Sequence, residues 1–417
     1  MPYSSQRRSS GNNYSRSGGS SSRGGGQFDR SGSRGFSSGR GGSRKPKFSK
    51  QYIDPSRFIK RAVVTTEVPE YVPVHTFADF DIHPLLKQNI IEKGYINPSP
   101  IQDQAIPHAL IGKDVVGIAN TGTGKTAAFS LPILHRLLNE PFARALIIAP
   151  TRELAQQIEE ELRSIAKGSG LFRAVLIGGS NMRDQLRDLK DLPSIVIGTP
   201  GRIKDHIERG SLDLSTFNMI TLDEVDRMLD MGFINDIRFI LDNLAAERQS
   251  FFFSATLEPS IRELINTFLS EPVVVSVKTG ETSENVEQNI VRASGSAEKI
   301  EKLHEILNHE ATGKTLVFDE TQRSVERLAK ELQERGFKVD SIHGGKTQGQ
   351  RTRALKQFKE SKLNVLVATD VAARGIDVAD ITHVINYTTP QTYDDYVHRI
   401  GRAGRAGRTG FALTFVD

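Results

Sequence analysis

Short apolar runs alternate with longer amphipathic stretches along most of this chain, and this alternation constrains the fold more than any other feature. From about residue 51 onward, runs such as 145–149 and 219–222 have the length and apolar character of buried parallel strands. Helical periodicity fills the intervals between such runs, for example at 153–166 and 233–244. Strands that alternate with helices form right-handed βαβ units, so we expect mostly parallel α/β sheets flanked by helices, with ligands at the carboxyl ends of the strands.

A polar stretch at 278–289 interrupts the alternation and is the expected hinge. Beyond it the strand-like runs resume at 314–318, 364–368, 383–386 and 411–415. The chain of 417 residues is long enough for two to three domains of about 150 residues. We therefore predict two α/β domains, at 51–277 and 288–417, joined by a linker at 278–287.

The composition excludes several classes of site. The chain has no cysteine, which rules out disulfides, thiolate nucleophiles, iron–sulfur clusters and zinc sites with cysteine ligands. No apolar run reaches the roughly 18 residues that a membrane-spanning helix needs, and the N-terminus lacks the apolar stretch of a secretory signal peptide. We expect an intracellular, cytoplasmic protein with no membrane partner.

Residues 1–50 form a compositionally distinct tail in which 8 Arg and 3 Lys face a single acid, and Gly and Ser fill 26 positions. Such a segment cannot bury enough apolar surface to fold, so we predict that it is a disordered basic tail. Its Arg-Gly clusters are interleaved with aromatic residues and suit single-stranded nucleic acid, because guanidinium groups neutralise phosphates and stack on bases. A solubilising tail or an organellar transit peptide are the alternatives, although the glycines would spoil the amphipathic helix that a transit peptide needs.

A glycine-rich turn lies between a strand-like run at 115–118 and the start of a predicted helix. In such a turn the backbone N–H groups wrap phosphate oxygens, and the helix N-terminus adds positive potential. Lys125 would reach the outer phosphates, and the Thr126 hydroxyl would hold Mg²⁺. The turn is a predicted nucleotide-binding loop made of Ala119, Asn120, Thr121, Gly122, Thr123, Gly124, Lys125 and Thr126.

Three acids follow the strand-like run at 219–222 in the sequence Asp223-Glu224-Val225-Asp226. Acids at the end of a buried strand suit a magnesium nucleotide: one carboxylate for the metal, here Asp223, and a second to orient or deprotonate the attacking water, here Glu224. An acidic turn that caps the next helix is the structural alternative.

Together, the loop and the acids resemble the DEAD-box ATP-dependent RNA helicases, a family built from two RecA-like domains. The resemblance runs from about Phe77 to the C-terminus, with the motifs in the family's order. The segment at about 75–103 resembles the family's Q motif, in which Gln102 would read the adenine edge and Phe77 would stack on the base. The resemblance implies ATP and Mg²⁺ as cofactors.

Other motifs of the family imply the remaining roles. Arg402 and Arg405 match the arginine fingers that reach the γ-phosphate, and Asp377 matches a ribose contact. Asp226, Ser254 and Thr256 match residues that link hydrolysis to unwinding. Contacts to the RNA backbone, without base reading, are implied for Pro150, Thr151, Arg152, Gly179, Thr199, Arg202, Gly344, Arg351, Thr369 and Arg374.

The sequence departs from the family pattern at a few positions. Val225 stands where the family has Ala, which leaves the three acids in place, and Ala403 replaces a Thr without removing a charge. The segment 316–321 matches the family's motif IV but is more acidic, and its residues Asp319 and Glu320 argue against a phosphate contact there.

Three classes of function compete. The first is an enzyme that couples ATP hydrolysis to local RNA unwinding or remodelling of RNA–protein complexes. The second is an ATP-gated RNA clamp, which shares every site residue with the enzyme and differs only in turnover. The third is a DNA translocase, which the RNA-backbone motifs and the Q motif disfavour.

Overall fold

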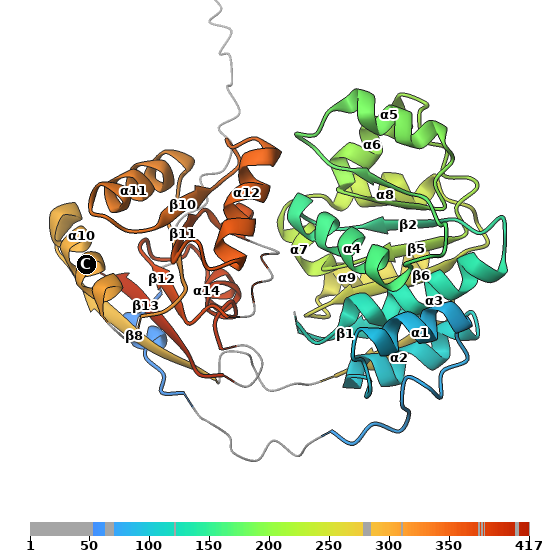
Figure 1. Cartoon of the computed structure of the whole chain (residues 1–417), viewed down its shortest axis with the longest axis horizontal. Helices are drawn as coiled ribbons and strands as arrows, with labels where there is room; N and C mark the ends of the chain where they lie inside the picture. Colours follow the sequence, from blue (N-terminus) through green and yellow to red (C-terminus); the bar gives the residue numbers. More distant parts are fainter. Residues whose placement is uncertain are drawn as a thin grey trace, which may run out of the picture. The chain divides into compact units, whose positions relative to one another are not determined.

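The computed structural model describes residues 53–62, 71–120, 122–277, 285–309, 312–373, 376, 378, 380–404 and 408–416. They form two all-parallel sheets, each with helices on both faces, which confirms the predicted α/β fold (Figure 1). The predicted tail at 1–50 lies outside the described residues, as does most of the predicted linker, 278–284.

The first sheet has the strand order β3-β4-β2-β5-β6-β1-β7. Its strands are β1 (Val115–Ile118), β2 (Ala145–Ile148), β3 (Arg173–Leu176), β4 (Ile195–Gly198), β5 (Met219–Leu222), β6 (Gln249–Ser254) and β7 (Val273–Ser276). Its helices are α1 (Pro84–Glu92), α2 (Pro100–Leu110), α3 (Lys125–Asn139), α4 (Arg152–Ile165), α5 (Met182–Lys190), α6 (Pro200–Glu208), α7 (Val225–Asp230), α8 (Ile234–Asp242) and α9 (Pro259–Phe268).

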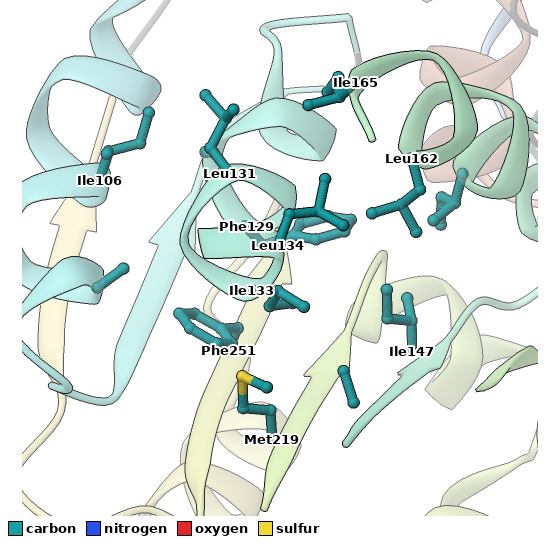
Figure 2. Close-up of a cluster of buried hydrophobic side chains, with 14 of the residues drawn as sticks. Ile106, Phe129, Leu131, Ile133, Leu134, Ile147, Leu162, Ile165, Met219 and Phe251 are labelled. Atoms are coloured by element: carbon teal, nitrogen blue, oxygen red, sulfur yellow. The ribbon is translucent and has the colours of Figure 1, made fainter. Parts of the chain in front are cut away.

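The first sheet is buried on both faces, because successive strand residues point to opposite sides. In β2, Ile147 belongs to a core formed with helices α1 to α4, whereas Leu146 and Ile148 belong to a second core under α5 to α9. Figure 2 shows part of the first core, where Leu134 of α3 lies near Leu162 of α4. The continuous apolar runs in the sequence reflect this burial on two sides.

The second sheet has the strand order β10-β11-β9-β12-β13-β8. Its strands are β8 (Val286–Arg292), β9 (Thr315–Phe318), β10 (Val339–Ile342), β11 (Val365–Ala368), β12 (His383–Asn386) and β13 (Gly410–Val416). Its helices are α10 (Gly295–Asn308), α11 (Gln322–Glu334), α12 (Gln348–Lys359), α13 (Asp370–Ala373) and α14 (Tyr393–Ile400). We call the two sheets with their helices the first and second lobes.

The N-terminal described segment packs on the second lobe, although the sequence analysis assigned residues 51–277 to the first domain. A short 3-10 helix, η1 (Pro55–Phe58), buries Phe58 completely among residues of the second lobe's core. The segment joins the edge strand β8 through a β-bridge between Lys60 and Gln288. β8 itself begins at Val286, two residues before the predicted start of the second domain at 288.

Candidate nucleotide and RNA site

The glycine-rich turn connects the end of β1 to the start of α3, as the sequence predicted. Ala119 continues the sheet by donating its N–H to the Ser254 carbonyl of β6 (2.9 Å), and α3 begins at Lys125. Gly124 has a φ of +91°, and a Cβ added there would lie 2.4 Å from Nε2 of Gln102. The position therefore needs glycine both for its backbone angle and for the close approach of Gln102. Thr121 lies outside the described residues.

Lys125 is held inside the turn that it follows. Its side chain is 6% exposed, and Nζ donates a hydrogen bond to the Ala119 carbonyl at 2.9 Å. The Thr123 hydroxyl closes the turn by donating to the Asn120 carbonyl at 2.8 Å. The loop is thus ordered by its own contacts, with a cation at its centre.

Two of the predicted acids follow the end of β5 and are buried together. Asp223 continues the sheet through its N–H to the Ile148 carbonyl (3.0 Å), and Glu224 has a φ of +53°. This left-handed conformation is uncommon for a residue with a side chain, and such strain is typical of functional sites. Glu224 forms a buried ion pair with Arg227, three residues further on in α7.

The charges around these acids separate their pKa values. Burial raises the pKa of Asp223, and the neighbouring Glu224 carboxylate raises it further, while Lys125 opposes both. Burial also disfavours the charged form of Glu224, but the positive charges of Arg227 and Lys125 outweigh it and lower the pKa of Glu224. Glu224 is therefore ionised at neutral pH.

Asp226 connects the acidic turn to the end of β6. Its Oδ2 accepts hydrogen bonds from the N–H groups of Ala255 (2.9 Å) and Thr256 (3.1 Å), and its own N–H donates to the Ser254 hydroxyl at 3.3 Å. The structure thus joins Asp226 to the end of β6 through two backbone N–H groups and the Ser254 hydroxyl.

A pocket of about 300 Å³ brings the turn and the acids together. Predicted residues on its wall are Gln102, Gly122, Gly124, Lys125, Thr126, Asp223, Glu224 and Arg402. Other wall residues, which the sequence analysis did not single out, are Tyr95, Ala127, Leu154, Gln157 and Glu161. The arrangement places a lysine, a hydroxyl and two carboxylates around one cavity, which is the chemistry needed to hold a magnesium nucleotide.

Of the two residues predicted to recognise adenine, Gln102 lines the pocket and Phe77 is buried beside it. Gln102 is 7% exposed; its Nε2 donates to the Gly124 carbonyl (3.0 Å), and its Oε1 accepts from the Ser99 N–H (2.9 Å). Phe77 is 2% exposed and packs on Phe80 and Tyr95, and it is not among the described residues that line the pocket. Tyr95, whose ring centroid lies 5.6 Å from that of Phe77, is a residue of the cavity wall.

The predicted RNA contacts of the first lobe lie directly after strands β2, β3 and β4. Thr151 caps α4 by accepting a hydrogen bond from the Leu154 N–H at 3.3 Å, and Thr199 is the N-cap residue of α6. The Arg152 guanidinium lies against the backbone of Gly179, where a Cβ would be 2.2 Å from Nη1. The remaining predicted residues are Pro150, which is buried, and Arg202, which lies 3.8 Å from Asp205.

In the second lobe, Arg351 forms an ion pair with Glu153, a residue for which the sequence predicted no role. Its Nη2 donates to Oε2 of Glu153 in α4 at 2.7 Å, and both side chains are buried. Gly344 follows β10, and Thr369 follows β11 with its N–H bonded to the Ile342 carbonyl at 3.3 Å. Three other predicted site residues, Arg374, Asp377 and Arg405, lie outside the described residues.

Family models match both lobes. Residues 99–264 match the DEAD/DEAH box helicase model, and residues 298–407 match the helicase conserved C-terminal domain. No helix within the described part of the chain has the length and apolar character to cross a membrane.

Curated proteins and solved structures agree with these matches. The chain is 45% identical to the ATP-dependent RNA helicase CshA of Listeria monocytogenes over 82% of this chain and 66% of that protein. It is also 45% identical to the DEAD-box ATP-dependent RNA helicase CshA of Bacillus subtilis, over 82% of this chain and 69% of that protein. The chain therefore spans about two thirds of the length of these relatives.

Among solved structures, S. cerevisiae Dbp5 bound to RNA and ADP BeF3 superposes with a TM-score of 0.72 at 29% identity, covering 82% of this chain and 89% of that one. Mss116p bound to ssRNA and AMP-PNP gives a TM-score of 0.73 at 29% identity, covering 82% and 75%. These likenesses identify both lobes as RecA-like domains. With a nucleotide-binding loop, the Asp-Glu-Val-Asp turn and both family models in one chain, this protein belongs to the DEAD-box ATP-dependent RNA helicase family.

Proposed function

We propose that this chain is an RNA-dependent ATPase that uses ATP hydrolysis to open short RNA duplexes or to remodel RNA–protein complexes. The observation that supports this most strongly is the pocket that gathers Lys125, Thr126, Asp223, Glu224 and Arg402. The family membership and the likeness to RNA-bound structures support RNA as the partner.

In this proposal the glycine-rich turn holds the phosphates of ATP. Backbone N–H groups at the start of α3 face the anion, and Lys125 exchanges its bond to the Ala119 carbonyl for the outer phosphates. The residues present fit Mg²⁺, which prefers oxygen ligands, because the Thr126 hydroxyl and the Asp223 carboxylate line the same cavity and would hold the ion there. When bound, the ion would neutralise charge that develops on the phosphates.

Glu224 is the proposed base that orients the attacking water and accepts its proton. Its lowered pKa keeps it ionised, and its ion pair with Arg227 fixes the direction of the carboxylate. Arg402, on the pocket wall, and Arg405 are the proposed fingers that stabilise negative charge on the transferred phosphoryl group. Asp377 is the proposed ribose contact, and Gln102 is the proposed reader of the adenine edge. Phe77 is the proposed ring that stacks on the base, which would require it to leave its buried position against Tyr95.

RNA is proposed to bind through its backbone, without base reading. The contacts would come from Pro150, Thr151, Arg152, Gly179, Thr199, Arg202, Gly344, Arg351, Thr369 and Arg374. Because Arg351 pairs with Glu153 in this structure, its contact with RNA requires that pair to open. Asp226, Ser254 and Thr256 would transmit hydrolysis to the RNA site, and the basic tail at 1–50 would add phosphate contacts.

We further propose that the predicted domains, 51–277 and 288–417, correspond to the two lobes, except that residues 53–60 pack on the second lobe and β8 extends that lobe to Val286. We also propose a cytoplasmic location. Cell fractionation with an antibody to the chain would test the location.

The test of function is the ATP turnover rate of the whole chain with no nucleic acid, with single-stranded RNA and with DNA of the same sequence, followed by strand displacement on a short RNA duplex. We expect stimulation by RNA and ATP-dependent displacement. Stimulation without displacement would favour the clamp, and equal stimulation by DNA would favour the translocase.

A further inference from the structure

The N-terminal segment Ile53–Lys60, which we call the anchor, is built to pack on the second lobe. Asp54 caps η1 by accepting a hydrogen bond from the Ser56 N–H at 2.9 Å, which fixes the turn that directs Phe58 inward. Phe58 is fully buried and Ile53 is 9% exposed, both within the core of the second lobe. The anchor therefore contributes side chains to that core and does not simply lie on the surface of the lobe.

Two side chains of the anchor pack on α14. The rings of Phe58 and Tyr396 have centroids 4.6 Å apart, and the Arg57 guanidinium lies 3.8 Å from the centroid of the Tyr393 ring. Both tyrosines belong to α14, so the anchor contacts successive turns of this helix.

A second set of contacts ties the anchor and α14 to the same strand. The backbones of Lys60 and Gln288 exchange two hydrogen bonds, of 3.1 and 2.8 Å, and the Tyr396 hydroxyl donates to the Gln288 side chain at 2.9 Å. In Figure 1 the blue segment with η1 lies beside β8. Anchor, strand and helix thus form one packed unit.

The helix held by this unit leads directly into Arg402. α14 ends at Ile400, and Arg402 donates its N–H to the Arg399 carbonyl (3.1 Å) and its Nη1 to the Ile376 carbonyl (3.1 Å). Ile400 and Ala403, on either side of Arg402, belong to the same core as Phe58. A shift of α14 therefore moves the arginine that lines the nucleotide pocket.

We propose that Ile53–Lys60 is a positioning element for ATP hydrolysis, which acts through Tyr396 and α14 to hold Arg402 in place. The inference rests on the proposed function only in assigning Arg402 to hydrolysis. Phe58 and Arg57 are positioning residues, since neither lines the nucleotide pocket among the described residues.

The test compares whole chains with Phe58→Ala, Phe58→Leu, Arg57→Gln and a matched control, Leu332→Ala. Leu332 is also fully buried in the second lobe, but it lies in the core on the opposite face of the sheet. Each variant is assayed at a temperature at which thermal unfolding shows it to be folded. Single-turnover ATP hydrolysis with saturating RNA gives the rate, and titration with ATP gives the KM.

We expect Phe58→Ala to lower the hydrolysis rate by roughly 10- to 100-fold, because a misplacement of about 1 Å can cost on the order of 10² in rate. The KM for ATP should stay within about twofold, since the ATP-binding loop is in the other lobe. Phe58→Leu should recover most of the rate. Arg57→Gln, which removes an exposed contact without emptying the core, should give a smaller loss with the same unchanged KM.

Amide hydrogen exchange of residues 393–403 gives a readout that does not depend on turnover. Phe58→Ala should speed exchange there, and Leu332→Ala should not. The proposal is overturned if Phe58→Ala and Leu332→Ala have the same hydrolysis rates, or if exchange at 393–403 is unchanged by Phe58→Ala. An inactive wild-type chain would refute the proposed function, while the exchange measurement would still decide whether the anchor positions α14.

Discussion

Replacing Glu224 by Gln should leave ATP binding intact and remove most of the turnover. The amide keeps the shape of the side chain and one oxygen, but it cannot accept the proton of the attacking water. General base catalysis contributes roughly 10² to 10⁴ in rate, so the barrier should rise by about 3 to 5 kcal/mol. Residual hydrolysis would reflect the phosphate-binding groups that remain.

The ion pair between Glu224 and Arg227 should also contribute to the free energy of unfolding, by an amount that its burial allows us to estimate. Both side chains are buried, so removing the carboxylate altogether leaves a buried charge without its partner, at a cost of about 3 to 5 kcal/mol. In the Glu224→Gln variant the amide oxygen would still accept a hydrogen bond from Arg227. We therefore expect this variant to lose only about 1 to 2 kcal/mol, and Glu224→Ala to lose more. For a lobe of this size that difference amounts to several degrees in Tm.

The assay is single-turnover hydrolysis at saturating ATP and RNA, beside equilibrium binding of a fluorescent ATP analogue and thermal unfolding. Glu263→Gln, an exposed carboxylate that pairs with Arg238 on the surface, is the matched control and should behave as wild type. Turnover by Glu224→Gln within about threefold of wild type would refute the assignment of Glu224 as the base, since general base catalysis contributes far more than that. Equal stability of Glu224→Gln and Glu224→Ala would refute the sizing of the ion pair.

Three further predictions concern the choice of nucleotide base, the basic tail and the Asp103 side chain. Gln102 should make RNA-stimulated hydrolysis select ATP over GTP, since a site matched to adenine leaves polar groups unpaired against guanine; equal efficiencies would argue against adenine reading. Deleting residues 1–50 should weaken RNA binding but preserve the maximal ATPase rate. The slope of log binding constant against log salt concentration should become shallower by about 0.7 for each lost phosphate contact, and an unchanged slope would mean that the tail only keeps the protein soluble. Asp103 holds the segment 71–75 through hydrogen bonds from the Tyr71 hydroxyl (2.6 Å) and from the backbone N–H groups of Val74 and His75. Burial alone would raise the pKa of Asp103, but these hydrogen bonds outweigh burial and lower the pKa below its usual value. Because the pKa of Asp103 is lower in the folded than in the unfolded state, its contribution to stability is present above about pH 4 and is lost as the pH falls through the folded-state pKa. Asp103→Asn should speed amide hydrogen exchange at 71–77 even at pH 7, and slow exchange in that variant would count against the assigned role.

The fold could be predicted from local patterns because its strands are buried on both faces. The runs at 219–222 and 383–386 became β5 and β12, and the periodic stretch at 153–166 became α4 (Arg152–Ile165) with small shifts at its ends. The nucleotide loop was equally readable, because its glycines and Lys125 are contiguous in the sequence.

Contacts between distant segments could not be predicted in this way. Nothing local in the anchor indicates that Phe58 packs on Tyr396, because the partner lies near the other end of the chain. The packing of Phe77 against Tyr95 also depends on how the Q motif segment folds over the first lobe. The pair between Glu224 and Arg227 was within reach of sequence reasoning, since Glu224 takes the N-cap position of α7 and Arg227 lies three residues further on in that helix.

The central claim is that ATP held by the first lobe is hydrolysed only with the arginines of the second. The most direct measurement is single-turnover ATP hydrolysis, with saturating RNA, by the whole chain, by its Arg405→Ala variant and by a fragment of residues 71–277, which omits the anchor because it belongs to the second lobe. We predict that the fragment binds magnesium-ATP but hydrolyses it negligibly, and that Arg405→Ala slows the whole chain steeply, since arginine fingers contribute roughly 10³ to 10⁵ in rate. Hydrolysis by the fragment at the rate of the whole chain would contradict the claim.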